Sequence, residues 1–351
     1  MRRYIIPALT AALVLAGCAK ETSTDTASAA KTYFQSWLQV HYPDAERAGN
    51  GIYILEDTPG DGETADIYTN PYAFVDFTVT DLDGTVVSTT VESVAKRVGS
   101  YSAANRYGER AWYVHDGYDG VFAGVEDMIR DMRIGGTRKA AIPYWLCTTD
   151  RYNSEEKYLK NVTSGSNVIY TITLHSMVPD IKEYEGKLLD QYAQEHLEGA
   201  DSTHIAGDEE LDRFGFYFVS RGIEREEDLT YTMPEDTTMY LNYTGKFLDG
   251  KVFDTTIENT AKDAGIFQSG KDYAPVKVTR GKLYTDVTMG GSSSIIAGFK
   301  AGIFMLHPME KAVVAFYSPL GYDYSGSGSA IPPYAPLVFE LELVEEPDLT
   351  E

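Results

Sequence analysis

Residue types that usually carry metal or acid–base chemistry are present in this chain, but they lack the spacing that such chemistry needs. Six histidines are scattered, and no two stand four residues apart as metal ligands on a helix do. Gly326-Ser327-Gly328 is only a fragment of a serine-hydrolase motif. The run at 290–294 has glycines and serines but no lysine for phosphate. We therefore expect no metal site, no cofactor and no covalent hydrolase.

A more informative pattern lies in the last third of the chain, where an aromatic–acid pair follows a tight turn. The segment 239–245 predicts a strand, Asp249-Gly250 a turn, and 251–254 a second strand that ends on Phe253-Asp254. A proline-containing loop at 331–336 then leads into a segment of strict alternation. Its apolar positions are Leu337, Phe339, Leu341 and Leu343, which predicts a strand with one buried face.

These segments resemble the FKBP family of peptidyl-prolyl cis-trans isomerases, in which aromatic side chains line a prolyl-binding pocket. The resemblance implies that Tyr243, Asp254 and Tyr322 are the catalytic groups. It also implies substrate-binding residues at Phe253, Ile295, Ile296, Phe299, Ile331 and Phe339. In that family the amide of the residue at Ile296 receives a ligand carbonyl, the residue at Phe299 forms the pocket floor, and the hydroxyl at Tyr322 reaches a substrate carbonyl.

A plainer interpretation of the same residues stays open. Phe253, Phe299 and Phe339 are each consistent with simple core residues, since single buried aromatics are common. Asp254 is consistent with a turn acid that caps Thr255 and Thr256.

The two halves of the chain share one order of elements, and this determines the expected fold. Strand, Asp-Gly turn and strand occur at 73–88 and again at 239–254, with Phe77 and Tyr243 at an offset of 166 residues. A short helix follows in each half, at 123–132 and 297–306, and each half closes on an alternating strand. We expect an α+β chain of two tandem FKBP-like domains, at 31–180 and 181–351, each a twisted antiparallel sheet wrapped on a short helix. The second domain would begin with a helix at 182–197.

The first of these domains departs from the family pattern at the pocket positions. It has Val87-Ser88 where the second has Phe253-Asp254, and Val125 where the second has Phe299. We therefore predict that the domain at 31–180 does not isomerise prolines.

The second domain carries an unusually long segment between its aromatic–acid pair and its helix. Residues 255–291 include five basic residues in an otherwise acidic chain, which fits a lid, a partner contact or a solvated loop. The Gly/Ser-rich run 325–329 predicts a loop more mobile than a packed flap.

The first eighteen residues predict a lipoprotein signal peptide. Arg2 and Arg3 precede an apolar stretch that is too short to span a bilayer, and Leu15-Ala16-Gly17-Cys18 resembles a lipobox. Lipid on Cys18 and a flexible tether at 19–30 would anchor the chain in the cell envelope, with the outer membrane of a Gram-negative cell as the expected site. The body of the chain would then lie in the periplasm or at the surface.

The net charge of −23 argues against a nucleic-acid partner, because such binding rests on Lys and Arg. Two functions remain. One is prolyl isomerisation of proline-containing peptides or unfolded exported proteins by a desolvating aromatic pocket without a covalent intermediate. The alternative is a non-catalytic FKBP-like binding lipoprotein.

Overall fold

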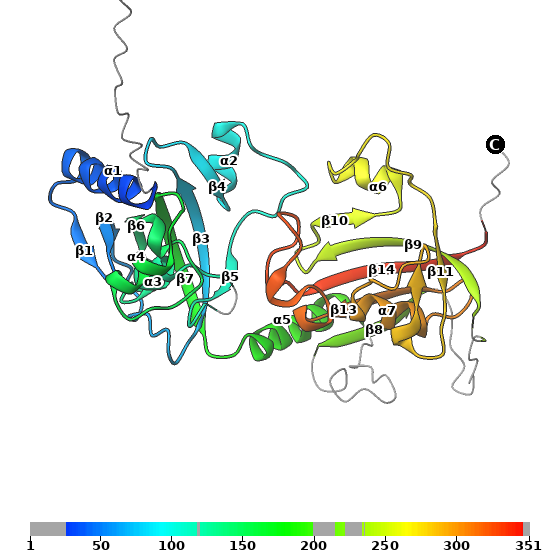
Figure 1. The fold of residues 1–351 in the computed structure, drawn as a ribbon. Helices are drawn as coiled ribbons and strands as arrows, with labels where there is room; N and C mark the ends of the chain where they lie inside the picture. Colours follow the sequence, from blue (N-terminus) through cyan, green and yellow to red (C-terminus); the bar gives the residue numbers. More distant parts are fainter. Residues whose placement is uncertain (1–25, 118–119, 199–214, 222–233, 235, 347–351) are drawn as a thin grey trace, which may run out of the picture.

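The computed structural model describes residues 26–117, 120–198, 215–221, 234 and 236–346 (Figure 1). Cys18 and the predicted signal peptide lie outside the described residues. None of the described helices is both long and apolar enough to cross a membrane.

The first half forms a seven-stranded antiparallel sheet with the order β1-β2-β6-β7-β3-β4, and β5 also pairs with β3. The short helix α3 (Ala123–Ile129) packs against β2 and β6 and is buried along its whole length. The strands are β1 (Glu46–Ala48), β2 (Ile52–Thr58), β3 (Tyr72–Thr80), β4 (Val86–Thr89), β5 (Arg110–Tyr113), β6 (Thr137–Ile142) and β7 (Val168–Val178).

The second half forms another seven-stranded antiparallel sheet, with the order β12-β11-β9-β14-β13-β8 and with β10 pairing to β9. Its short helix is α7 (Ala297–Met305), which lies against β13 and β14. The strands are β8 (Phe216–Arg221), β9 (Thr238–Phe247), β10 (Val252–Thr255), β11 (Val276–Thr279), β12 (Thr288–Met289), β13 (Lys311–Phe316) and β14 (Leu337–Val344). Strands β2, β6, β7 and β3 lie in the same order as β8, β13, β14 and β9. The predicted α+β fold of two antiparallel sheets, each with a short helix, is confirmed.

The remaining elements are short, apart from α1 and α5. They are α1 (Thr26–His41), α2 (Glu92–Val98), η1 (Tyr144–Leu146), α4 (Glu155–Asn161), α5 (Ile181–His196), α6 (Glu258–Asp263), η2 (Tyr284–Asp286), η3 (Ser318–Leu320) and η4 (Asp323–Ser325).

Helix α1 occupies the end of the segment that the sequence predicted to be a flexible tether. We expected a flexible tether to residue 30, whereas the helix begins at Thr26. The added turn is rich in alanine, which has the highest helix propensity, and it continues a helix anchored by the buried side chains of Phe34, Trp37 and Leu38. The Asn167 side chain also donates a hydrogen bond to the Ala30 carbonyl at 3.2 Å. The tether prediction was therefore wrong for residues 26–30.

Helix α5 connects the two halves and contacts both (Figure 1). Its first turn is capped by Asp180, whose carboxylate accepts hydrogen bonds from the Lys182 and Glu183 amides. Near this end Tyr184 packs on Phe74 of the first sheet, with ring centroids 4.7 Å apart. Farther along, Leu189 and Ala193 join the core of the second half. The helix thus packs against both halves.

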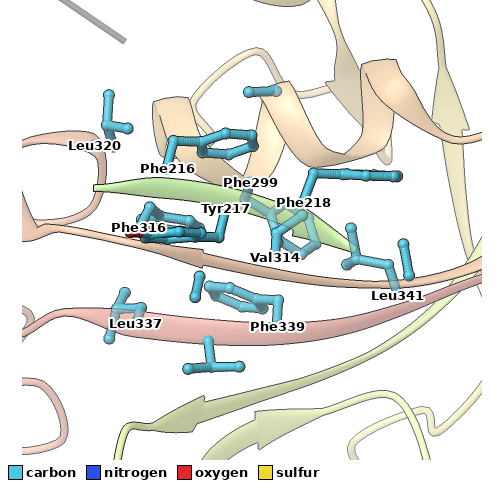
Figure 2. Close-up of a cluster of buried hydrophobic side chains, with 14 of the residues drawn as sticks. Phe216, Tyr217, Phe218, Phe299, Val314, Phe316, Leu320, Leu337, Phe339 and Leu341 are labelled. Carbon is cyan, nitrogen blue, oxygen red and sulfur yellow. The ribbon is translucent and has the colours of Figure 1, made fainter. Parts of the chain in front are cut away.

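The core of the second half is a layer of aromatic and aliphatic side chains between its sheet and α7 (Figure 2). All four alternating residues of β14 that the sequence predicted to be buried are at most 5% exposed. The helix can approach the sheet closely because it carries Gly298, where a Cβ atom would lie 2.5 Å from the Phe316 ring.

Candidate functional site

A hollow of about 160 Å³ opens beside this aromatic layer in the second half, and we call it the aromatic pocket. Strands β9, β10 and β14, the start of α7 and the loop before η4 supply most of its walls. The lining residues are Tyr243, Phe253, Asp254, Met289, Ser294, Ile295, Ile296, Phe299, Tyr322 and Phe339.

Four rings meet in this pocket, and Phe339 is at their centre. Its centroid lies 4.7 Å from that of Phe299, 5.6 Å from that of Phe253 and 6.3 Å from that of Tyr243. Phe299 also meets Tyr243 edge to face at 5.3 Å. Edge-to-face contacts of this kind stabilise ring clusters beyond their buried area. Phe299 and Phe339 are only 3% and 5% exposed, so each is a core residue whose edge also lines the pocket.

Gly245 makes this arrangement of rings possible. A Cβ atom at this β9 position would lie 2.6 Å from the Phe253 ring and 2.8 Å from the Phe339 ring. A side chain larger than hydrogen would push one ring away from the strand. The glycine therefore sets the distance between two pocket walls.

The Asp254 carboxylate is held by three donors. The Tyr243 hydroxyl donates to Oδ2 at 2.7 Å, while the Lys271 ammonium at 2.6 Å and the Thr255 amide at 2.9 Å approach Oδ1. The Thr255 contact fits the capping interpretation of this acid, but the bond to Tyr243 also fixes a pocket wall. Burial raises the pKa of Tyr243, and the Asp254 charge adds to this effect, so the phenol stays protonated.

Two hydrogen-bond donors at the pocket have no acceptor among the described residues. They are the hydroxyl of Tyr322 and the backbone amide of Ile296, which caps the N-terminus of α7. Burial raises the pKa of Tyr322, with a further contribution from Asp254, so this hydroxyl also remains a donor. A ligand carbonyl in the pocket can accept from either group.

The structure brings eight of the nine predicted pocket residues together and leaves one apart. Ile331 does not line the pocket: it is 4% exposed in the core, and its backbone pairs with Ser327. It lies there because that pairing closes the loop and turns the side chain inward. Met289 and Ser294 do line the pocket but were not predicted, because no motif marks them.

The long segment 255–291 is folded and lies beside the pocket. It contains α6 and β11 (Figure 1) as well as η2 and β12, and its Lys271 makes the ion pair with Asp254. None of Phe267, Tyr273 and Tyr284 lines the pocket; the first two stack on each other at 5.4 Å.

The Gly/Ser-rich loop that follows Tyr322 is hydrogen-bonded within itself and to the first half. Ser327 and Ile331 exchange two backbone hydrogen bonds, at 2.7 and 3.1 Å. At its tip, the Ser329 carbonyl accepts from the Arg106 amide at 2.8 Å, and the Ser329 hydroxyl donates to the Asn105 side chain at 2.7 Å. The loop thus has hydrogen bonds to the first half, and its mobility stays a prediction.

One comparison with known proteins falls on the half that holds the pocket. The family model of FKBP-type peptidyl-prolyl cis-trans isomerases matches residues 230–344. FK506-binding protein 1B of Aspergillus fumigatus is 32% identical over 108 residues, which are 31% of this chain and 77% of that protein. The chain belongs to the FKBP family. The resemblance predicted from the sequence is confirmed.

Two further relatives cover different shares of the chain. The peptidyl-prolyl cis-trans isomerase Mip of Chlamydia muridarum is 31% identical over 108 residues. The match covers 31% of this chain but only 33% of the length of that relative. A crystal structure of the three FKBP domains of wheat FKBP73 aligns with 84% of this chain and 94% of its own, at 17% identity and a TM-score of 0.27.

Proposed function

We propose that this chain is a peptidyl-prolyl cis-trans isomerase that acts on X-Pro bonds of exported proteins through the aromatic pocket of its second half. The observation that carries the proposal is the convergence of Tyr243, Phe253, Phe299 and Phe339 on one hollow, with Asp254 bonded to the first of them.

Such a pocket suits the reaction because isomerisation needs no nucleophile. The barrier to rotation about an X-Pro bond comes from amide resonance, which is lost when the bond twists. A site that binds the twisted amide more tightly than the planar one accelerates rotation. Ring walls that exclude water disfavour the dipolar planar amide, and they hold the proline ring at the same time.

The polar groups at the pocket have distinct roles in this proposal. The Ile296 amide and the Tyr322 hydroxyl bind carbonyls of the substrate on either side of the rotating bond. Tyr243 donates to Asp254, so it is a wall held in place by that acid. Lys271 partly neutralises the Asp254 charge.

We further propose that lipid on Cys18 anchors the chain in the outer membrane of a Gram-negative cell, where unfolded exported proteins would be its partners. Palmitate labelling of cells that produce the chain tests this: label is expected on the wild type, and labelling retained in Cys18→Ala would contradict it.

A protease-coupled assay with an X-Pro peptide tests the activity on the purified full chain. We expect a rate well above buffer that falls about tenfold in Asp254→Ala, because one charge-assisted hydrogen bond is worth roughly 1.5–3 kcal/mol. Asp263→Ala, which removes an exposed carboxylate of α6, is the matched control and should keep the wild-type rate. A wild-type rate equal to buffer would leave the non-catalytic binding alternative in its place.

Replacing Lys271 tests how charge at the pocket selects substrates. In Lys271→Met the Asp254 carboxylate loses its cation, so we expect kcat/KM for a Lys-Pro peptide to rise relative to a Glu-Pro peptide by about two- to fivefold, in line with roughly 0.2–1 kcal/mol for an exposed ion pair. The ratio should shrink at high salt because screening weakens exposed charges. Lys262→Met, whose ion pair with Glu258 lies on α6, is the control. An unchanged ratio in Lys271→Met would show that the carboxylate does not act on the substrate.

A further inference from the structure

The two halves correspond residue by residue between β3 and β5 and between β9 and β11, each at an offset of 166 positions. The Phe77 amide donates to the Thr90 hydroxyl at 2.9 Å, and the Tyr243 amide donates to the Thr256 hydroxyl at 3.0 Å. Tyr101 and Tyr107 stack at 5.4 Å, as Phe267 and Tyr273 do. The backbone of the two halves is therefore alike in this region. Where the residue types differ at equivalent positions, the chemistry of the two halves differs.

The first half has its own cavity in this region, with a volume of about 380 Å³. We call it the interface cavity, because loop residues of the second half close one side of it. Its walls include Phe77, Ser88, Ser100, Tyr107, Arg110 and, from the second half, Ser329. The first three of these correspond to Tyr243, Asp254 and Ile266.

The charge of this cavity is opposite to that of the aromatic pocket. Ser88 stands where the second half has the acid Asp254, and Arg110 stands where it has Val276. All the described residues that line the cavity are neutral or basic, and the basic ones are Arg106 and Arg110. Arg106 is already paired with Asp249 at 2.7 Å, so Arg110 supplies the uncompensated charge.

Arg110 is half-buried and has no anion beside it among the described residues. Its Nε is buried and has no hydrogen-bond partner, and one Nη donates to the Arg106 carbonyl at 3.2 Å. The described part of the chain offers it no carboxylate as an ion-pair partner. Burial lowers the pKa of Arg110, which reflects the loss of water around the charge. A charge that has lost part of its water and has no ion-pair partner destabilises a fold, and a bound anion would compensate it.

The geometry points to the interface cavity as a binding site for a small ligand that carries an oxyanion, a carboxylate or a phosphate, held by the Arg110 guanidinium. A guanidinium is a planar fork that matches the oxygens of such groups. The hydroxyls of Ser88 and Ser100 add donors, and Phe77 and Tyr107 offer apolar surface to the body of the ligand. A ligand there would contact both halves.

Titration of the full chain with three probes tests the site, followed through the ¹⁵N–¹H signal of Arg110 Nε. The probes are inorganic phosphate, acetyl-dialanine with a free carboxylate, and the amide of that peptide. We expect a saturable shift with phosphate or with the free acid, and at least tenfold weaker binding of the amide. Binding of phosphate alone identifies a free anion as the ligand, and binding of the free acid identifies a peptide carboxylate. Absence of a shift with both anions overturns the proposal.

Two variants of Arg110 and one control variant separate the site from general charge effects, with calorimetry as the readout. Arg110→Met should weaken anion binding at least tenfold, and Arg110→Lys should keep part of it because one charge remains. Arg97→Met removes an exposed arginine of α2 and should bind as the wild type does. Thermal unfolding checks that each variant is folded; if Arg110→Met is not, the Lys variant and the amide probe decide. Equal affinity of Arg110→Lys and wild type, together with equal binding of acid and amide, would refute the site.

Discussion

Replacement of Phe339 by alanine is expected to destabilise the second half by about 3–5 kcal/mol, the range for loss of a buried aromatic ring. Its ring contacts those of Phe299, Phe253 and Tyr243, and it stacks on Phe316 at 5.8 Å. Truncation removes the shared contact of three pocket walls and leaves a cavity that the strand cannot close. We therefore also expect kcat/KM to fall at least tenfold at temperatures where the variant is folded.

The chain offers a convenient way to measure this effect. All three tryptophans, Trp37, Trp112 and Trp145, lie in the first half. Urea unfolding followed by tryptophan fluorescence then reports the first half, and far-ultraviolet circular dichroism reports both. Phe339→Ala should lower the stability of the second half far more than that of the tryptophan-reported transition.

Two controls make the result specific. Phe339→Leu keeps most of the volume and should cost roughly 1–2 kcal/mol. Phe267→Ala removes a ring that is 43% exposed and should cost less than about 1 kcal/mol. A loss in Phe339→Ala no larger than that in Phe267→Ala would contradict a central role for the Phe339 ring.

Replacement of Glu185 by glutamine is expected to stabilise the chain increasingly as the pH rises from 4.5 to 8. Glu185 of α5 is 1% exposed, and its carboxyl accepts from the Ser318 amide at 2.6 Å and bonds the Ser318 hydroxyl at 2.7 Å. Burial raises the pKa of Glu185 to about 8, and the charge of Asp323 also raises it. The hydrogen bonds from Ser318 lower the pKa, and the charge of Lys182 lowers it more weakly.

The sign of the pH effect follows from proton linkage. Because the pKa of Glu185 in the folded state lies above the ordinary glutamate value of 4.5, the folded state holds a proton that the unfolded state releases. The resulting stabilisation is complete below pH 4.5 and is lost as the pH rises through 8. At about 1.4 kcal/mol per pKa unit, the loss approaches roughly 5 kcal/mol as an upper bound. A glutamine keeps both contacts to Ser318 and does not ionise.

Urea unfolding of wild type and Glu185→Gln at pH 5, 7 and 9 measures this difference. The matched control is Glu183→Gln, an exposed glutamate of the same helix that pairs with Lys187. Its difference from wild type should stay within roughly 0.5 kcal/mol at every pH. If the difference in the free energy of unfolding between Glu185→Gln and wild type did not change with pH either, the buried carboxyl would not be the group that titrates. Because Ser318 begins the segment that leads to Tyr322, the same variant should also extend isomerase activity to higher pH.

Several features of the second half were predictable from local sequence. The Asp249-Gly250 turn requires a residue with positive φ, and Gly250 adopts it at 83°. The alternation of β14 could place its apolar residues on only one face, and these proved to be buried. Tyr243, Phe253 and Asp254 come together because two strands joined by a tight turn must pair with each other.

The sequence also contains a longer correspondence between the two halves than the one used for the prediction. The correspondence between Phe77 and Tyr243 continues without a gap through Glu92 and Glu258, Lys96 and Lys262, and Tyr107 and Tyr273. Extending it would have predicted that residues 255–279 fold, since residues 89–113 of the first half correspond to them. It would also have shown that Arg110 of the first half occupies the position equivalent to Val276 of the second half.

By itself, the sequence determined strands β9, β10 and β14, the Asp249-Gly250 turn and the ring-bearing face of β14, because these follow from side-chain periodicity and from turn chemistry within a few residues. Only the tertiary structure decided that Lys271 pairs with Asp254, that Met289 rather than Ile331 lines the pocket, and that Ser329 rests on the first half. These contacts join segments far apart in the chain. Their formation depends on how loops close over the packed sheets, which no local pattern encodes.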